Sequence, residues 1–493
     1  MSNNTLPILS KKNHEKKTAK IKIMQFGEGN FLRAFIDWII QKMNDSGKYE
    51  GHVVVVQPLP HGRVDQLEDQ DGLYTLVLQG LDEKGEAVRK HRIIDVLDDF
   101  INPYTQYQKF LKYAESKDLE VIVSNTTEAG IAYDPNDVSV DFEKECPASY
   151  PGKLLALLKH RYDTLGKSYG LAIAPCELID DNGDKLKEVL IKLAKDKNFS
   201  ADFIDYLTNS CHYTSTLVDR IVPGFPKENF ASLCEEYGYI DNNMDYGEYF
   251  HLFVLKKEPY VEEKYPVNKV GINAIYVDDV HPYKQRKVRI LNGTHTSLVP
   301  TAYLAGFNEV GESLSDPTIN KFIMEEINKE IVPTVHTKDA DKFASDVIKR
   351  FLNPYVHHQL MSIALNSLSK WKERDLPTLL DDINSGFIPT HLCFAFASLI
   401  KFYDGYRLVN GKKETIALKD DANGISFMRS AWDKYYADKD ASELVNTVLS
   451  NASLWGQDLT KVKGLANEVT KDLKLILAAP SQMDAIKEFL NHE

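Results

Sequence analysis

The sequence predicts an α/β domain with a parallel sheet, followed by a mainly α-helical domain. From about residue 20, strand-like and helix-like stretches alternate, which is typical of parallel strands joined by helical crossovers. From about residue 280, long stretches with apolar residues at helical spacing take over. The polar, proline-bearing stretch "KKEPYVEEKYPVNK" (256–269) is the best candidate for the boundary between the strand-and-helix region and the helical region. We therefore expect one domain over residues 19–265 and a second over residues 270–493.

The α/β domain opens with a strand, a helix and a second strand. "KIKIMQF" (20–26) alternates like a strand, and "NFLRAFIDWIIQKMND" (30–45) carries apolar residues at helical spacing. "HVVVV" (52–56) indicates a buried second strand, because β-branched residues run without interruption. Next, "LYTLVLQG" (73–80) and "EAVRKHRIIDVL" (86–97) predict a hairpin inserted into the sheet.

Two further central strands and the helices of the second domain complete the expected fold. "LEVIVSN" (119–125) and "YGLAIAPC" (169–176) are short apolar runs typical of buried strands. In the second domain, "LMSIALNSLSKWKERDL" (360–376) predicts one long amphipathic helix. We also treat residues 286–299 as helical.

Composition limits the partners and the compartment. The net charge of −13 argues against a nucleic-acid or anionic-membrane partner, since either needs a basic face. No apolar run is long enough for a signal peptide or a membrane span; the longest is "LCFAFASLI" (392–400). The five cysteines are scattered, which argues against a zinc site or a disulfide framework. We expect a metal-independent cytoplasmic protein, and its oligomeric state stays open.

The turn after the first strand carries the spacing of a phosphate-binding turn. Gly27 and Gly29 lie directly between the first strand and the first helix. At such a place one glycine makes the tight turn, and the other lets the backbone approach a pyrophosphate at the helix N-terminus. An ordinary strand-to-helix turn could look similar, but strand, helix and position agree. We therefore predict an expanded Rossmann-type dinucleotide-binding domain, although Leu32 stands where a third glycine is usual.

The residues after the second strand leave the choice of dinucleotide open. Gln57 stands where an acidic residue often binds the adenosine ribose of NAD. Its amide can bond a ribose hydroxyl but does not repel a 2′-phosphate. His61 and Arg63 lie close by, so these residues do not decide between NAD and NADP.

The stretch "RKVRILNGTHTSLVP" (286–300) contains Lys287, Asn292 and His295. In a regular helix, Asn292 lies roughly 140° and His295 roughly 80° around the axis from Lys287. A lysine in a dry cleft is a suitable proton donor or acceptor, and an asparagine amide is a suitable oxyanion donor. A solvated basic helix face is the alternative, and spacing alone favours it because Lys284 and Arg289 are near.

Two patterns together resemble the mannitol dehydrogenase family, the polyol-specific long-chain dehydrogenases. These are K-x4-N-x2-H at Lys287, Asn292 and His295, and G-x-G-x-F-x-R from Gly27 to Arg33. The likeness runs from about residue 20 to about 465 through blocks such as "DGLYTLVLQGL", "SNTTEAGIAY" and "RFLNPYVHHQLMSIALNSLSK". The resemblance implies a metal-independent, NAD-linked enzyme that reduces a keto hexuronate, a small acidic sugar, to an aldonate.

The resemblance also implies roles for single residues. Lys287 is the general acid/base, Asn292 the oxyanion donor, and His295 positions the reacting oxygen. Asp219 and Lys370 match substrate-contact positions, although an ion pair with the next arginine and a solvated helix face are ordinary alternatives. Further candidates for the substrate are Glu177 and Asn182, and for the cofactor Phe26, Gly27, Glu28, Gly29, Asn30, Phe31, Arg33, Gln57, Asn125, Thr127 and Glu128.

One departure bears on the substrate. Mannitol-type members carry an arginine eight residues before the substrate lysine, and this chain has Ser362 there. The polyol-binding pattern is thus altered. Alternatives that stay open are a reductase for the hexuronate that differs at one carbinol, a mannitol-type polyol dehydrogenase, and a nucleotide-binding sensor without catalysis. The intact Lys/Asn/His set argues against the sensor.

Overall fold

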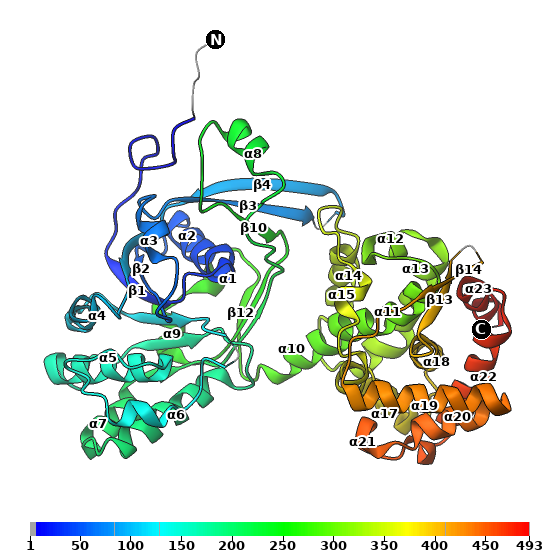
Figure 1. Ribbon diagram of the computed structural model, residues 1–493. Coiled ribbons are helices and arrows are strands. Elements are labelled where there is room, and N and C mark those ends of the chain that lie inside the picture. The colour runs from blue at the N-terminus through cyan, green and yellow to red at the C-terminus, as the bar shows by residue number, and fades with distance from the viewer. Residues whose placement is uncertain (1–5, 83, 128, 410, 493) are drawn as a thin grey trace, which may run out of the picture. The chain divides into compact units, whose positions relative to one another are not determined.

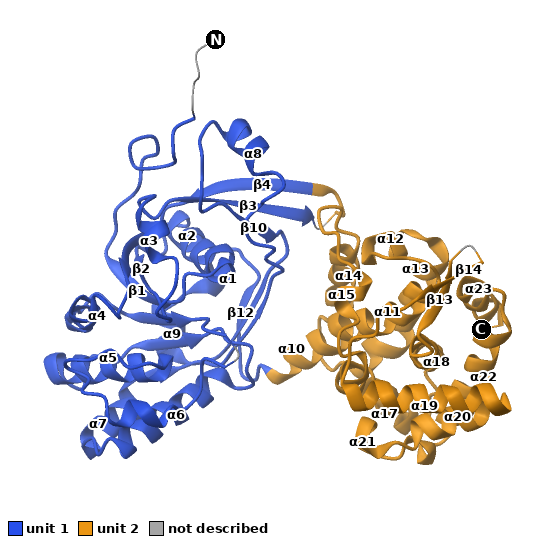
Figure 2. Cartoon of the chain, viewed as in Figure 1, with its two compact units in different colours: residues 1–82, 88–280 blue, residues 83–87, 281–493 orange. Residues whose placement is uncertain are grey.

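The computed structural model describes residues 6–82, 84–127, 129–409 and 411–492 (Figure 1). The chain divides into two compact units, shown in different colours in Figure 2. Unit 1 comprises residues 1–82 and 88–280, and unit 2 comprises residues 83–87 and 281–493. The stretch 256–269 lies inside unit 1, where it contributes helix α9 (Pro259–Lys264).

Unit 1 is built on a parallel sheet with the strand order β5-β2-β1-β6-β7-β8 (Figure 1). Counted along the chain, this is the order 3-2-1-4-5-6 of a doubly wound nucleotide-binding fold. The predicted strands 20–26, 52–56, 119–125 and 169–176 are confirmed. The sheet strands are β1 (Ile21–Phe26), β2 (His52–Val56), β5 (Leu97–Ile101), β6 (Val121–Ser124), β7 (Ala172–Pro175) and β8 (His212–Tyr213).

Alternate residues of the central strands pack against opposite layers. Ile23 and Val55 belong to a core with the helix that follows β1, whereas Met24 and Val54 belong to a core with α4, α5 and α6. Burial on both faces explains why β2 reads as an unbroken apolar run. The covering helices of unit 1 are α3 (Val64–Glu68), α4 (Tyr107–Lys112), α5 (Tyr150–Leu165), α6 (Asn182–Asp196), α7 (Ala201–Asp205) and α8 (Phe230–Tyr237).

The helix after β1 forms where it was predicted but is not regular. It consists of α1 (Asn30–Leu32), a π-helical turn η1 (Arg33–Asp37) and α2 (Trp38–Asp45). Every residue of η1 is buried. The π turn thus lies entirely within the packing of unit 1.

The predicted hairpin exists, but its place in the sheet was wrong. Strands β3 (Tyr74–Leu81) and β4 (Ala87–Ile94) join β10 (Asp245–Glu248) in a separate sheet of order β10-β3-β4. The central sheet has no place for them, because β2 is already paired with β1 on one side and β5 on the other. A further sheet contains β9 (Thr216–Asp219), β11 (Leu252–Lys256) and β12 (Ala274–Val277).

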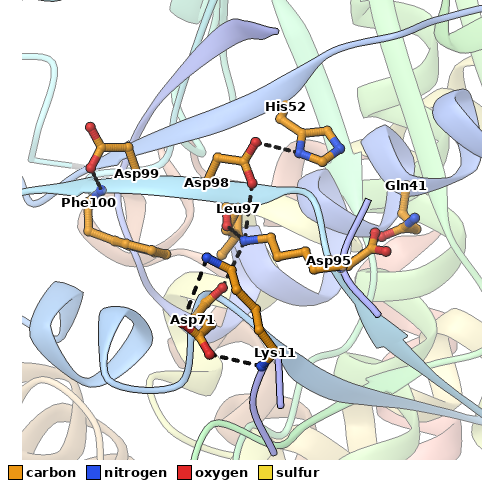
Figure 3. Close-up of polar contacts among 10 residues, drawn as sticks. Lys11, Gln41, His52, Asp71, Asp95, Leu97, Asp98, Asp99 and Phe100 are labelled. Atoms are coloured by element: carbon orange, nitrogen blue, oxygen red, sulfur yellow. Dashed lines mark hydrogen bonds and ion pairs between the residues drawn. The ribbon is translucent and has the colours of Figure 1, made fainter. Parts of the chain in front are cut away.

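The segment before β1 is fastened to the sheet by charged contacts (Figure 3). Lys16, whose side chain is almost fully buried, donates to the carbonyl of Asp71 at 2.8 Å and pairs with Asp98 at 3.1 Å. The other oxygen of Asp98 lies 2.7 Å from Nδ1 of His52 on β2. Burial lowers the pKa of Lys16. These contacts hold the segment beside β5, the strand at the edge of the sheet that carries Asp98.

Unit 2 is mainly helical, as predicted. Its central helix runs through α10 (His281–Arg286), a π-helical turn η6 (Lys287–Gly293) and α11 (Thr294–Leu304). Around it lie α12 (Val310–Ser315), α13 (Pro317–Glu326), α14 (Ala340–Phe351), α17 (Leu376–Ser385), α18 (Thr390–Phe402), α19 (Ala422–Asp438), α20 (Ala441–Leu449), α22 (Leu465–Ala478) and α23 (Gln482–His492).

The apolar run 392–400 and the helix expected over 360–376 both lie in unit 2. The apolar run 392–400 lies in α18, which packs between α11 and α22. Among the described residues, no helix is long and apolar enough to cross a membrane. The prediction of a single helix over 360–376 was wrong. The stretch is divided into α15 (Leu360–Ile363) and α16 (Ser367–Arg374), because Asn366 takes a left-handed conformation with φ +56°.

Candidate active site

The glycine turn after β1 is shaped for a ligand. Gly27 has φ +124° and donates to the carbonyl of Val56 at 3.0 Å. A Cβ at Gly27 would lie 2.8 Å from the Leu32 side chain, so only glycine fits this turn. A Cβ at Gly29, in contrast, would meet no described atom within 4 Å. The protein packs against the first glycine and leaves space at the second, which fits the approach of a pyrophosphate.

The other predicted residues of this turn mostly hold its shape. Phe26 is buried, with its ring 5.0 Å from that of Tyr150, and Phe31 stacks on Phe35 at 5.1 Å. Asn30 lies at the start of α1, and its Oδ1 accepts a bond from a neighbouring arginine at 2.7 Å. The aromatic side chains thus pack into unit 1, and the backbone of these residues forms the turn.

That arginine is Arg33, and its side chain is 2% exposed. It pairs with Asp245 at 3.5 Å and lies over the ring of Tyr74 at 5.2 Å. Burial raises the pKa of Asp37 and of Asp245 to about 7. Arg33 therefore joins the turn to the interior of unit 1, and its guanidinium is directed inward.

Glu28 and Gln57 meet in the loop after β2. Glu28 Oε1 accepts a bond from the backbone N–H of Arg63 at 3.2 Å, and burial raises the pKa of Glu28. The amide nitrogen of Gln57 donates to the carbonyls of Leu59 at 2.8 Å and Pro60 at 3.2 Å. The Gln57 side chain thus shapes the loop in which a ribose would lie.

Glu177 supports the loop that follows β6. One carboxylate oxygen accepts the backbone N–H and the hydroxyl of Thr126, at 3.0 and 2.9 Å, and the other accepts the hydroxyl of Ser124 at 3.0 Å. The pKa of Glu177 is raised by burial. Asn125 donates from its amide to the carbonyl of Cys176 at 2.9 Å. These bonds join the ends of β6 and β7 into one rigid edge.

Thr127 carries the strain of this loop. Its φ is +102°, an unusual value for a β-branched residue and one often found at functional sites. Glu128, the next predicted residue, lies outside the described residues. The three predicted substrate positions of unit 1 are all buried, since Glu177 is 3%, Asn182 0% and Asp219 5% exposed.

Asn182 is fully occupied by backbone contacts. Its amide nitrogen donates to the carbonyls of Pro175 and Glu177, both at 3.0 Å, and its oxygen accepts the N–H of Thr216 at 2.8 Å. It therefore holds the end of β7 beside the start of β9. Asp219 is the last residue of β9.

In unit 2, the π turn η6 brings Lys287 and Asn292 onto one side of the helix. A π-helix is closed by hydrogen bonds between residues five apart, and these two residues are five apart. The regular-helix angle of roughly 140° between them was therefore wrong. His295 follows in the first turn of α11.

These three residues form a partly exposed stripe on an otherwise buried helix, although the Nε2 atom of His295 is itself buried. From Arg286 to Ala302, all within the described part of the chain, only Lys287, Val288, Asn292 and His295 are not buried. The alternative of a solvated basic face loses the support of the flanking Arg286 and Arg289, because both are buried. The side-chain amide of Asn292 has no hydrogen-bond partner among the described residues.

His295 is held as a neutral ring. It stacks on Phe351 at 4.1 Å and meets His358 edge-on at 5.1 Å. Burial, and then the positive charges of His358, Arg350, Arg374 and Lys370, lower its pKa well below the ordinary value. Its Nε2 has no partner within the described chain. A neutral imidazole can accept or donate one hydrogen bond to a reacting oxygen.

Lys370 lies on α16, near this ring. Its Nζ donates to the carbonyl of Ile363 at 2.7 Å, and burial lowers its pKa. One turn further, Arg374 donates to the hydroxyl of Thr296 at 3.3 Å, and that hydroxyl donates to the carbonyl of Asn292 at 2.9 Å. Sequence reasoning missed Arg374: its spacing of four from Lys370 places both on one helix face but does not show where that face lies. No group of three or more potential metal ligands occurs among the described residues.

Comparison with known proteins covers both units. The model of the mannitol dehydrogenase Rossmann domain matches residues 21–288, and that of the mannitol dehydrogenase C-terminal domain matches residues 279–477. Altronate oxidoreductase of Yersinia enterocolitica is 43% identical over 92% of this chain and 94% of its own length. Altronate oxidoreductase of Cronobacter sakazakii is 44% identical over the same shares.

Two solved structures share the fold. A D-sorbitol dehydrogenase in substrate-free form superposes with a TM-score of 0.80 at 21% identity, over 98% of each chain. The Pseudomonas fluorescens mannitol 2-dehydrogenase, solved with NAD and D-mannitol, gives 0.68 at 19% identity over 98% of this chain and 100% of its own. With both domain models matched in order, and relatives above 40% identity over nearly the whole length, the chain belongs to the mannitol dehydrogenase family.

Proposed function

We propose that the protein is an NAD-dependent oxidoreductase that reduces D-tagaturonate to D-altronate, reversibly, in the breakdown of hexuronates. The observation that supports this choice of substrate is the 42–44% identity to altronate oxidoreductases over 92–93% of the chain. The Lys–Asn–His stripe on η6 and α11 supports carbinol chemistry. Unit 1 supports the cofactor, because its glycine turn has room for a pyrophosphate at Gly29.

Bound NADH would supply the hydride to the ketone carbon. The chain must then provide a proton for the carbonyl oxygen and stabilise the charge that develops there. Lys287 donates the proton in the reducing direction and takes it from the alcohol in the oxidising direction. Asn292, whose amide has no protein partner within the described chain, donates a hydrogen bond to the oxyanion. His295, held neutral between Phe351 and His358, positions the same oxygen.

In unit 1 we assign the cofactor to the carboxyl edge of the parallel sheet. Gly27, Gly29 and Asn30 would face the pyrophosphate, and Gln57 would lie at the ribose. Asn125 and the strained Thr127 would approach the nicotinamide end, held in place by Glu177. We assign NAD rather than NADP on the family resemblance, since Arg63 also lies beside the loop of Gln57.

The assay that tests this proposal compares three substrates. Purified protein is mixed with NADH and with tagaturonate, fructuronate or fructose at equal concentration, and NADH consumption is followed. The proposal expects the highest kcat/KM for tagaturonate. A higher value for fructuronate or fructose would assign the chain to another member of the family, and no turnover with any of them would leave a nucleotide-binding sensor. The same assay with NADPH tests the cofactor.

A further inference from the structure

Helix α16 (Ser367–Arg374) presents two cations on one face. Lys370 and Arg374 are four residues apart and therefore neighbours on the helix surface. Like charges at this spacing destabilise a helix by a few tenths of a kcal/mol. Both side chains are half-buried, and α16 packs against η6 and α11, the elements that carry Asn292 and His295.

Within the described chain, neither cation forms an ion pair. Lys370 donates to the carbonyl of Ile363, and Arg374 donates to the hydroxyl of Thr296. Both acceptors are neutral. Half-buried cations that bond only neutral groups carry a desolvation cost which a bound anion would offset.

The acids next to this pair bond other groups or are buried. Asp420, which attracts Lys370, accepts the N–H of Leu368 at 3.0 Å and the hydroxyl of Tyr403. Asp375, next to Arg374, is 1% exposed, and burial raises its pKa well above the ordinary value. Neither acid forms an ion pair with Lys370 or Arg374 among the described residues.

The same face adjoins the stripe assigned to catalysis. Arg374 reaches Asn292 through the hydroxyl of Thr296, with contacts of 3.3 and 2.9 Å. Lys370 and Arg374 are also among the cations that depress the pKa of His295. An anionic group bound here would lie close to a carbonyl held by Asn292 and His295. In a keto hexuronate the carboxylate stands four carbon–carbon bonds from the ketone.

We propose that Arg374, together with Lys370, forms a carboxylate-binding site that selects acidic sugars over neutral ones. The guanidinium of Arg374 offers paired donors that match a carboxylate, and Lys370 adds a second charge. The site deepens the proposed function, on which it rests for the identity of the sugar. It assigns to Arg374 a role in specificity, distinct from the proton transfer at Lys287.

Kinetics with a matched pair of substrates test the proposal. D-tagatose carries a hydroxymethyl group where tagaturonate carries the carboxylate. For Arg374→Met, we expect kcat/KM for tagaturonate to fall by about thirtyfold or more, the usual loss when one partner of a charged pair is removed. Tagatose turnover should change less than threefold, and Arg374→Lys should restore part of the loss. Lys372→Met is the control, because Lys372 is a cation of the same helix that lies against Gly456.

Binding measurements decide the matter even if the wild type turns over no tagatose. Calorimetric titration of the protein–NADH complex with altronate, and with the neutral altritol, separates charge recognition from hydroxyl recognition. We expect Arg374→Met to weaken altronate binding at least tenfold and altritol binding little. Equal losses for both ligands would overturn the proposal and leave Arg374 as a support for Thr296. A wild type that prefers fructuronate would contradict the proposed substrate, while the altronate–altritol difference would still report on this site.

Discussion

Two of the four π-helical turns among the described residues, η1 and η6, make an instructive comparison, because the same irregularity occurs in a buried and in a partly exposed helix. In η1 (Arg33–Asp37) every residue is buried, and Arg33 is surrounded by Asn30, Asp245 and Tyr74. In η6 (Lys287–Gly293) the lysine and the asparagine that the π spacing aligns are both half-exposed. π turns are frequent at functional sites. What separates the two is accessibility: η1 is enclosed within unit 1, and η6 leaves Lys287 and Asn292 partly exposed, where we propose that they meet the substrate.

Replacing Lys287 is expected to produce the largest effect. Lys287→Ala should lower turnover by about a hundredfold to ten-thousandfold, the range for loss of a general acid/base. NADH binding, measured by fluorescence titration, should be nearly unchanged, because the cofactor residues lie in unit 1. Gln285→Ala, on the exposed side of α10, is the control. Turnover that stays near the wild-type value when chemistry is rate-limiting would remove Lys287 from the mechanism.

Arg33→Met tests whether the buried π turn serves stability rather than catalysis. Removing one member of a buried charged pair typically costs about 3–5 kcal/mol, so the free energy of unfolding measured in urea should fall by this order. The kcat at saturating NADH should change far less than in Lys287→Ala. Arg92→Met is the control, since the pair of Arg92 with Asp45 is about one-third exposed and is worth about 1 kcal/mol or less. A hundredfold loss of kcat with unchanged stability would show that η1 also takes part in the chemistry.

Strand and helix positions in unit 1 could be predicted because each element carries its own signal. The run at 52–56 is buried on both faces, so its pattern needs no knowledge of neighbours. The sheet of the hairpin could not be predicted in this way, because its partner β10 lies far along the chain and pairs through backbone bonds. The break at Asn366 also escaped, since that residue adopts φ +56° within a stretch without glycine or proline.

The types of residue in the site could be predicted from the sequence, but their arrangement in space could not. The Lys287, Asn292 and His295 pattern was recognisable. A regular helix would separate the first two, however, and no residue of the stretch signals the π turn. Arg374 escaped because a basic residue one turn from Lys370 looks the same on a solvated face. Its bond to Thr296 depends on how α16 packs on α11, which is a tertiary contact.

Gly29→Val tests whether the open glycine serves the cofactor. The backbone angles of Gly29, φ −70° and ψ 165°, suit any residue, and no described atom lies within 4 Å of the added Cβ. Stability should therefore stay within about 0.5 kcal/mol, as for an ordinary surface change. The dissociation constant of NADH should rise by tenfold or more, because the side chain would fill the space of the pyrophosphate. Gly29→Ala should give a smaller rise, and unchanged affinity in both variants would exclude this turn from the cofactor site.

The last prediction concerns protons in the buried environment of η1 and leaves catalysis unchanged. Burial raises the pKa of Asp37 and of Asp245 to about 7, against an ordinary aspartate value near 4. Between about pH 4 and pH 7 the folded protein therefore holds protons that the unfolded chain has released. Stability from these groups is fully present below pH 4 and is lost as the pH rises towards 7.

Asp37→Asn removes one of the two titrations and keeps an oxygen that can accept the bond from the Tyr74 hydroxyl, which lies 2.9 Å from the carboxylate. Urea unfolding at steps between pH 4 and pH 7 should show a decline in the wild type that is flatter in the variant, by about 3 kcal/mol over the window. The kcat of the variant should keep the pH profile of the wild type, because no residue of η6 changes. A variant whose stability declines with pH as steeply as the wild type would show that Asp37 is already ionised in the folded state. In that case Arg33 would balance two charges, and the buried π turn would be held by an ion triad.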